Sequence, residues 1–170
     1  IYNDVRRFGF FKLFENIKLK EITYLKKLGP ETFSVLFCIK YFQEFIKNSK
    51  KNIKNLLMDQ TFVSGLGNIY VNEALFMSKI MPTRICNTLS KQEIKNLILN
   101  IKKVLKTSIL KGGSSIRDFQ STSGKSGSFQ QFFHVYNQEG EKCSRISCKG
   151  KIKKIVLSNR SSFYCNMCQN

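Results

Sequence analysis

The stretch that decides the fold is CSRISCKGKIKKIVLSNRSSFYCNMC, residues 143–168. Its four cysteines follow the pattern C-x4-C-x16-C-x2-C, two close pairs separated by a long segment. Thiols paired in this way predict one tetrahedral structural zinc, held by Cys143, Cys148, Cys165 and Cys168. Four unrelated thiols, or two disulfides in a secreted protein, are the alternatives. The paired spacing and the lysine-rich segment between the pairs favour zinc.

The segment between the cysteine pairs predicts a β-hairpin with a basic surface. Residues 152–157 and 161–164 have the composition of its two arms. The segment contains basic residues and no acidic one. Its cations are Arg145, Lys149, Lys151, Lys153, Lys154 and Arg160. A zinc module with this charge indicates an anionic partner, and nucleic acid fits best.

The composition of the whole chain supports that interpretation. It has 29 Lys and Arg against 11 Asp and Glu, a formal net charge of +18 over 170 residues. Such an excess predicts a phosphate-rich partner and salt-dependent binding. Hydrophobic residues make up 42% of the chain, with 15 Phe, so a folded core is expected rather than a disordered basic tail. No run of 18 apolar residues occurs, so no membrane span is predicted.

The middle of the chain is predicted to be helical. Apolar residues recur at roughly helical spacing over 31–47, where Cys38 is expected to be a buried core residue. A short helix is expected to end near residues 59–60, and the glycines of VSGLGN (63–68) interrupt the pattern before a new helix begins near Asn68. A glycine-rich turn leaves amides free at a helix start, which suits a phosphate, although a purely structural joint is the alternative.

A longer helix follows, with a clear start signal. Ser90 and Glu93 form the pattern of a capping box, and the helix is expected to run to about Leu110. One apolar stripe on this helix is interpreted as core. Its members are Ile94, Leu97, Ile101, Val104, Leu105 and Ile109.

A Gly/Ser-rich loop, KGGSSIRDFQSTSGKSGS, occupies residues 111–128. Its length is typical of a functional loop, and the two interpretations are a flexible linker and a loop that covers a ligand. Strand-like sequence is expected from Phe129 into the zinc module. Cys86 has no predicted role.

Five stretches in this order resemble the formamidopyrimidine-DNA glycosylase family. They are YNDVRRFG (2–9), LGPE (28–31), LLMDQTFVSGLGNIYVNEALF (56–76), KGGSSIRDF (111–119) with the Gly–Lys–Ser–Gly that follows it, and residues 143–169, which end in RSSFYCNMCQ. Together they extend over nearly all of the chain. It departs from the family pattern at Val5, where the family has Pro, at Asn137–Gln138, where Gly–Arg is common, and in its C-x4-C pair, where C-x2-C is usual.

The resemblance implies an α+β fold that is mostly α. Residues 1–28 would be the end of an N-terminal β-sandwich domain. Residues 29–128 would form a helix–two-turn–helix DNA-binding domain with a lesion loop at 111–128, and residues 129–170 a zinc finger built on a β-hairpin. The chain starts with Ile1 in strand-like sequence, so we expect an upstream part of the protein to precede it.

The resemblance also implies an activity. Enzymes of this family remove oxidised purines, namely 8-oxoguanine and formamidopyrimidines, in base-excision repair and cut abasic sites by β,δ-elimination. Their nucleophile is an N-terminal proline amine, followed by a glutamate, and a catalytic lysine lies on the same upstream domain. We therefore expect residues 1–170 alone to lack glycosylase and lyase activity, the more so because their lysines are expected to be exposed, protonated cations.

Individual residues take roles from the same resemblance. DNA-binding residues would be Arg6, Arg7, Phe8, Lys50, Lys54, Asn68 and Arg160. Arg6 and Phe8 match the wedge that fills the hole left by an extruded base. Arg160 matches the arginine that clamps phosphates and takes part in δ-elimination. Lesion-side residues would be Glu73, Gly112, Gly113, Ser114 and Ser115.

The expected partners are damaged double-stranded DNA and one structural zinc, in a monomeric protein of the bacterial cytoplasm that associates with the nucleoid while it is on DNA. Two other functions stay open. One is an endonuclease VIII-type glycosylase for oxidised pyrimidines. The other is a non-enzymatic, zinc-containing nucleic-acid-binding module.

Overall fold

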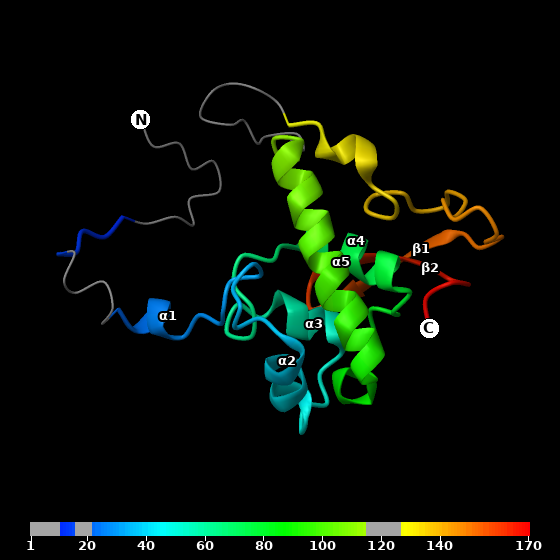
Figure 1. Ribbon diagram of the computed structural model, residues 1–170. Coiled ribbons are helices and arrows are strands. Elements are labelled where there is room, and N and C mark those ends of the chain that lie inside the picture. The colour runs from blue at the N-terminus through cyan, green and yellow to red at the C-terminus, as the bar shows by residue number, and fades with distance from the viewer. Residues whose placement is uncertain (1–10, 16–21, 115–126) are drawn as a thin grey trace.

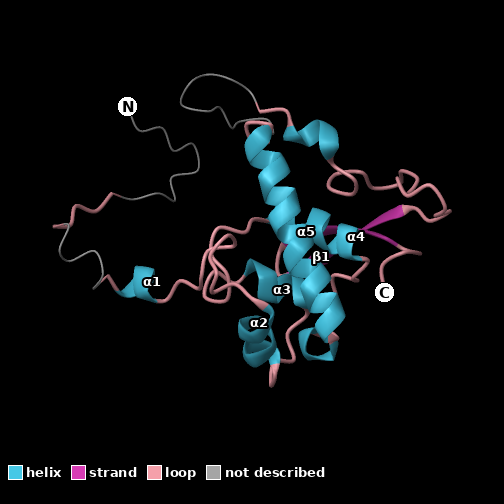
Figure 2. Cartoon of the chain, viewed as in Figure 1, coloured by secondary structure: helices cyan, strands magenta, loops and turns pink. Residues whose placement is uncertain are grey.

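A helical body carries a C-terminal hairpin in the computed structural model, which describes residues 11–15, 22–114 and 127–170 (Figures 1 and 2). The α-helices are α1 (Thr23–Lys26), α2 (Ile39–Ile46), α3 (Ile53–Met58), α4 (Asn68–Ser78) and α5 (Lys91–Leu110). Short 3-10 turns, η2 (Cys86–Thr88) and η3 (Phe129–Phe132), and strands β1 (Ile152–Leu157) and β2 (Arg160–Cys165) complete the order. In the described part of the chain no helix is long and apolar enough to span a membrane.

Helix α4 is the centre of the molecule. Its six residues from Val71 to Phe76 are all buried, whereas an ordinary surface helix buries only one stripe. It packs against α5 on one side and against β2 on another. Its sequence therefore has to satisfy the buried polar side chains of Asn72 and Glu73, and both find partners outside the helix.

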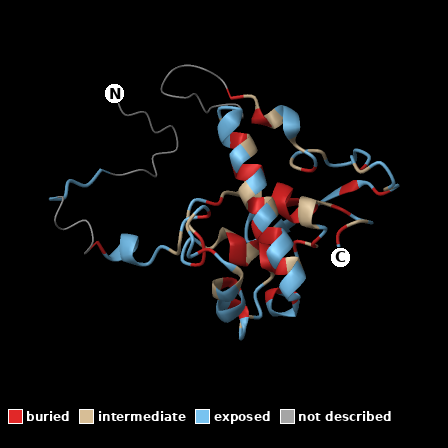
Figure 3. Ribbon diagram, viewed as in Figure 1, coloured by how far each residue is buried: buried red, intermediate tan, exposed pale blue. Residues whose placement is uncertain are grey.

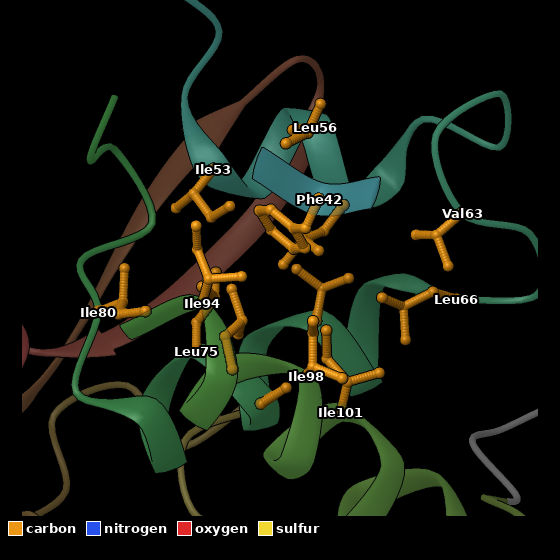
Figure 4. Close-up of a cluster of buried hydrophobic side chains, with 14 of the residues drawn as sticks. Phe42, Ile53, Leu56, Val63, Leu66, Leu75, Ile80, Ile94, Ile98 and Ile101 are labelled. Atoms are coloured by element: carbon orange, nitrogen blue, oxygen red, sulfur yellow. The ribbon is translucent and has the colours of Figure 1, made fainter. Parts of the chain in front are cut away.

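The main core lies between α2, α3, α4 and α5, and the ribbon of Figure 3 shows in red the buried residues of these helices. Figure 4 shows Phe42, Ile53 and Leu75 pointing toward Ile94 and Ile98 of the long helix. A second, smaller cluster joins the zinc-finger residues Ile152 and Phe163 to Phe76 of α4. The hairpin therefore packs directly against the helical body.

The helix boundaries follow local chemistry. The capping box of α5 is confirmed, because Ser90 Oγ accepts from the Glu93 amide at 3.2 Å and Glu93 Oε2 accepts from the Ser90 amide at 2.7 Å. Asn52 caps α3 by accepting from the Asn55 amide at 2.8 Å. Helix α4 ends at Lys79, which adopts the left-handed conformation that terminates many helices.

The two strands form the predicted antiparallel hairpin, in which Ile152 pairs with Cys165 and Leu157 with Arg160. Only Ser158 and Asn159 connect them, and both have positive φ, at 47° and 58°. Two residues with positive φ are typical of the type I′ turn, whose twist matches the strands. The turn places Arg160 at the tip of the hairpin.

Four expectations about the fold are wrong. Residues 31–38 form turns and bends, and the helix begins only at Ile39. The reason is that Glu31 pairs with Ser64, and Ser34 Oγ accepts a hydrogen bond from the Leu36 amide. Cys38 is consequently exposed.

At the other end of the helical body, Ile109 lies on the outer surface, since the core stripe ends at Leu105 and Ser108. Phe129–Phe132 is a 3-10 turn rather than a strand, and it places the Phe129 ring against the Tyr70 ring. The expectation that residues 1–28 end a β-sandwich domain stays a prediction, because the described residues of that segment are 11–15 and 22–28, of which Thr23–Lys26 form α1.

Candidate zinc site and phosphate-binding surface

The four cysteines converge as the spacing predicts. Their sulfur atoms all lie within 4.8 Å of one another, with Cys143 Sγ 3.8 Å from Cys168 Sγ and Cys148 Sγ 3.6 Å from Cys165 Sγ. Four thiolates about 2.3 Å from a tetrahedral zinc lie about 3.8 Å apart, so the cluster fits one zinc ion. With four protein ligands the ion has no open position for water or substrate, so its role is structural.

The surroundings of the thiols shift their pKa values in opposite directions. Burial raises the pKa of the Cys143 and Cys168 thiols. Burial acts in the same direction on Cys165, but hydrogen bonds from the amides of Met167 and Cys168 outweigh it and lower the pKa of that thiol to about 7. Zinc binds thiolates, so binding releases protons and weakens as the pH falls.

Helix α4 connects the zinc finger to the helical body through its buried polar side chains. Asn72 Oδ1 accepts from the Phe163 amide of β2 at 2.7 Å. The Glu73 carboxylate accepts three backbone amides, from His134 at 2.9 Å, Val135 at 3.0 Å and Tyr136 at 2.9 Å. Glu73 therefore holds the segment that leads into the zinc finger, and a role on the lesion side stays a prediction.

The lengthened first cysteine pair contributes a further contact. Arg145, between Cys143 and Cys148, donates to the carbonyls of Phe76 at 2.8 Å and Met77 at 3.1 Å at the end of α4. Its guanidinium also lies 4.8 Å from the centre of the Phe76 ring. An arginine that caps the last carbonyls of a helix is favourable because these carry partial negative charge. The sequence pattern indicates Arg145 only as one of the cations of the segment between the cysteine pairs and carries no signal for this contact.

Three of the DNA-binding candidates meet at the tip of the hairpin. Lys54 Nζ donates to Ser161 O at 2.7 Å and to Ser162 Oγ at 2.6 Å. Asn68 Nδ2 donates to the same carbonyl, Ser161 O, at 3.2 Å. Arg160, one residue earlier, is exposed. Elements α3, α4 and β2 thus bring a lysine, an asparagine and an arginine to one place.

The start of α4 adds unpaired donors to this place. Gly67 is the N-cap residue and offers no side chain, so no side-chain cap covers the first amides of the helix. Gly65 has φ of +81°, a conformation that favours glycine in the turn before the helix. Free amides and the positive end of an 11-residue helix favour an anion.

Lys54 is not the exposed cation that the sequence suggested. Its side chain is completely buried between α3 and the hairpin. Burial, and secondarily the nearby Arg160 guanidinium, lower its pKa to about 8. The sequence places Lys54 beside exposed lysines, and its acceptors lie more than a hundred residues further along the chain, so local pattern carried no signal for this burial.

The other predicted site residues are located less closely or not at all. Lys50 is exposed in the turn between α2 and α3. Gly112 and Gly113 have φ of 70° and 83°, and Ser114 pairs with Ser128 at the neck of the Gly/Ser loop. The remaining candidates, Arg6, Arg7, Phe8 and Ser115, lie outside the described residues.

Comparison with known proteins gives this geometry its context. Residues 28–120 match the "Formamidopyrimidine-DNA glycosylase H2TH domain", and residues 140–170 match the "Zinc finger found in FPG and IleRS". The chain belongs to the formamidopyrimidine-DNA glycosylase family. It is 45% identical over 175 residues to the formamidopyrimidine-DNA glycosylase of Bartonella tribocorum, and 45% identical over 168 residues to that of Roseobacter denitrificans. These alignments include 99% of this chain and 60% and 59% of those two relatives.

Solved structures of the family have the same fold. The Lactococcus lactis protein in complex with DNA containing an abasic site matches with a TM-score of 0.88 and 40% identity, over 98% of this chain and 60% of that one. The MutM protein of Thermus thermophilus matches with a TM-score of 0.81 and 34% identity, over 88% of this chain and 56% of that one. The 170 residues therefore span about 60% of the length of the curated family members they match.

Proposed function

We propose that the full-length protein is a bifunctional DNA glycosylase and abasic-site lyase that removes 8-oxoguanine and formamidopyrimidines in base-excision repair. Residues 1–170 supply its DNA-binding surface and its zinc finger. The relatives described above are formamidopyrimidine-DNA glycosylases, so neither the oxidised-pyrimidine branch nor a non-enzymatic module is favoured. The expected setting is a monomer in the bacterial cytoplasm, associated with the nucleoid while on DNA.

The observation that carries this proposal is the convergence of Lys54, Asn68 and Arg160 at the hairpin tip, beside the free amides of α4. Charged and amide donors that approach from three elements suit consecutive phosphates of a DNA backbone. An enzyme that acts on a base inside a duplex has to extrude it, and firm contacts to the neighbouring phosphates hold the distorted strand. Arg160 would supply such a contact and take part in δ-elimination.

The covalent steps are assigned to the domain that precedes this chain in the family. There the amine of an N-terminal proline would displace the damaged base and form a Schiff base with the sugar, and elimination would then cut the strand. The zinc would take no part in these steps, because its four thiolates leave no coordination position. In this division of work, the present residues grip the DNA and the preceding domain reacts with it.

The test is duplex binding by an Arg160→Ala variant. Loss of a charge-assisted hydrogen bond to phosphate should weaken binding to an abasic-site duplex by about 1.5–3 kcal/mol while the zinc content stays at one ion per chain. Lys95→Ala, which removes an exposed cation from α5, is the matched control and should change affinity little. Equal affinity of Arg160→Ala and the wild type would remove Arg160 from the binding surface.

A further inference from the structure

The side chain of Lys54 has more donors than partners at the hairpin tip. An ammonium group carries three N–H donors. Two of them are used, for Ser161 O at 2.7 Å and Ser162 Oγ at 2.6 Å. Both acceptors belong to β2, immediately after Arg160. Lys54 therefore fixes the backbone from which the Arg160 side chain projects, and it retains one further N–H.

A small cavity adjoins this group. It has a volume of about 140 Å³ and lies between α3 and the hairpin turn. Its lining includes Lys54 and Asn55 from α3, and Ser158 and Arg160 from the hairpin. The rest of the lining is the Asp59 carboxylate and the apolar residues Met58 and Leu157. A space of this size, with two cations, an amide and a hydroxyl in its wall, can hold a single phosphate group between the cations.

We propose that Lys54 is a positioning residue that links DNA binding to a proton: the cavity accepts a backbone phosphate beside Arg160 when Lys54 is an ammonium, and releases it when Lys54 becomes an amine. This inference rests on the proposed function and deepens it. A neutral amine keeps two donors, enough for Ser161 O and Ser162 Oγ, but its third position becomes a lone pair. Deprotonation thus leaves the hairpin attached while it replaces an attraction for phosphate with a repulsion.

The charged groups around Lys54 favour such a change. Arg160 faces it from β2 and makes a second cation in the same place unfavourable. Asp59, at the end of α3, also lines the cavity. Its carboxylate already forms a salt bridge with Lys51 at 2.9 Å and accepts a hydrogen bond from the Thr61 hydroxyl at 2.6 Å. In the described residues neither Lys54 nor Arg160 forms an ion pair with an acidic side chain. A phosphate between the two cations would supply that negative charge.

The direction of the pH dependence follows from this arrangement. Burial and Arg160 lower the pKa of Lys54 to about 8 in the free protein, and a bound phosphate raises it again because it favours the ammonium. A group whose pKa is higher in the complex strengthens binding fully below its free-state pKa. That contribution is lost as the pH rises through 8 and above. DNA binding should therefore take up protons in mildly alkaline solution.

The experiment measures binding of zinc-loaded residues 1–170 to a duplex that contains a tetrahydrofuran abasic-site analogue. At constant ionic strength, affinity should fall roughly five- to tenfold between pH 7 and pH 9. Calorimetry at pH 8.5 in two buffers of different ionisation enthalpy should report an uptake of about half a proton or more. Lys54→Met should abolish both effects, and the exposed-lysine control Lys95→Met should retain both.

Nuclear magnetic resonance of the Lys54 side chain in the wild-type protein tests the inference without a variant that could fail to fold. The ammonium should titrate in mildly alkaline solution in the free protein and at higher pH when the duplex is bound. An unchanged titration on DNA binding, or pH-independent affinity with no proton uptake, would overturn the role of Lys54 while leaving the proposed function intact. Absence of duplex binding at every pH would overturn the proposed function itself.

Discussion

Replacement of Glu73 tests whether the zinc finger is held to the helical body by one buried carboxylate. The side chain is 2% exposed and accepts the amides of His134, Val135 and Tyr136. Glu73→Ala leaves three amides without their acceptor, and a buried unsatisfied donor costs about 1–3 kcal/mol. A cavity of about 370 Å³ beside Glu73 and His134 lets water reach part of the site, so we expect a total loss of about 3–5 kcal/mol.

The substitution Glu73→Gln keeps the size and shape of the side chain and replaces one acceptor oxygen by an NH2 group. The carboxamide oxygen can still accept two of the amides, but its NH2 group faces the third. We expect a loss of about 2–3 kcal/mol, less than for alanine. The assay is urea unfolding of the zinc-loaded protein, with amide exchange at residues 134–136 as the local probe, and Glu44→Gln, at an exposed position of α2, as the matched control.

The reasoning would be refuted by a loss below about 1 kcal/mol in Glu73→Ala with unchanged amide exchange at residues 134–136. A variant of normal stability that binds lesion-containing duplex poorly would instead support the lesion-side role that the family resemblance implies for Glu73.

Three further predictions concern zinc, salt and chemistry. Cys165→Ser should release the metal and unfold the hairpin, because zinc binding supplies folding free energy. Metal analysis of the correctly folded wild type should find one zinc ion per chain. A zinc content well below one ion per chain would contradict the site. Affinity for duplex should fall by roughly three orders of magnitude between 50 and 200 mM salt if about five to eight phosphates are neutralised, and a flat titration would exclude the phosphate contacts. Residues 1–170 alone should bind abasic-site duplex without excising 8-oxoguanine or forming a borohydride-stable adduct. Lys54, with a pKa of about 8, is mostly protonated at pH 7 and is hydrogen-bonded to β2, so its amine is not expected to attack the sugar. A trapped adduct at Lys54 would show that its amine is a nucleophile.

Local patterns predicted much of this structure. The capping box at Ser90, the glycine-rich break before α4 and the hairpin between the cysteine pairs are all signals that act within a few residues, and each is confirmed. The zinc cluster was equally accessible, because ligand spacing within each knuckle is itself local and the hairpin brings the two knuckles together. Apolar spacing failed over residues 31–38, where pairing of Glu31 with Ser64 overrides a helical pattern.

The polar contacts of the site could not be predicted in the same way. The acceptors of Lys54 lie 107 and 108 residues away, and the three amides bound by Glu73 lie 61 to 63 residues away. Nothing near either residue indicates such partners. The DNA-binding and lesion-side roles came from the family resemblance alone. The structure adds that Lys54 and Glu73 also maintain the shape of the surface on which those roles depend.

The distance in sequence between Lys54 and its acceptors has a consequence during synthesis of the protein. A ribosome adds about 5–20 residues per second, so about 5–20 s pass between the appearance of Lys54 and that of Ser161. During that interval the helices from α2 to α5 can assemble, but Lys54 has no hairpin to hold and Arg160 does not yet exist. The proposed phosphate site therefore cannot form on a nascent chain until its zinc finger has been made and has taken up its metal.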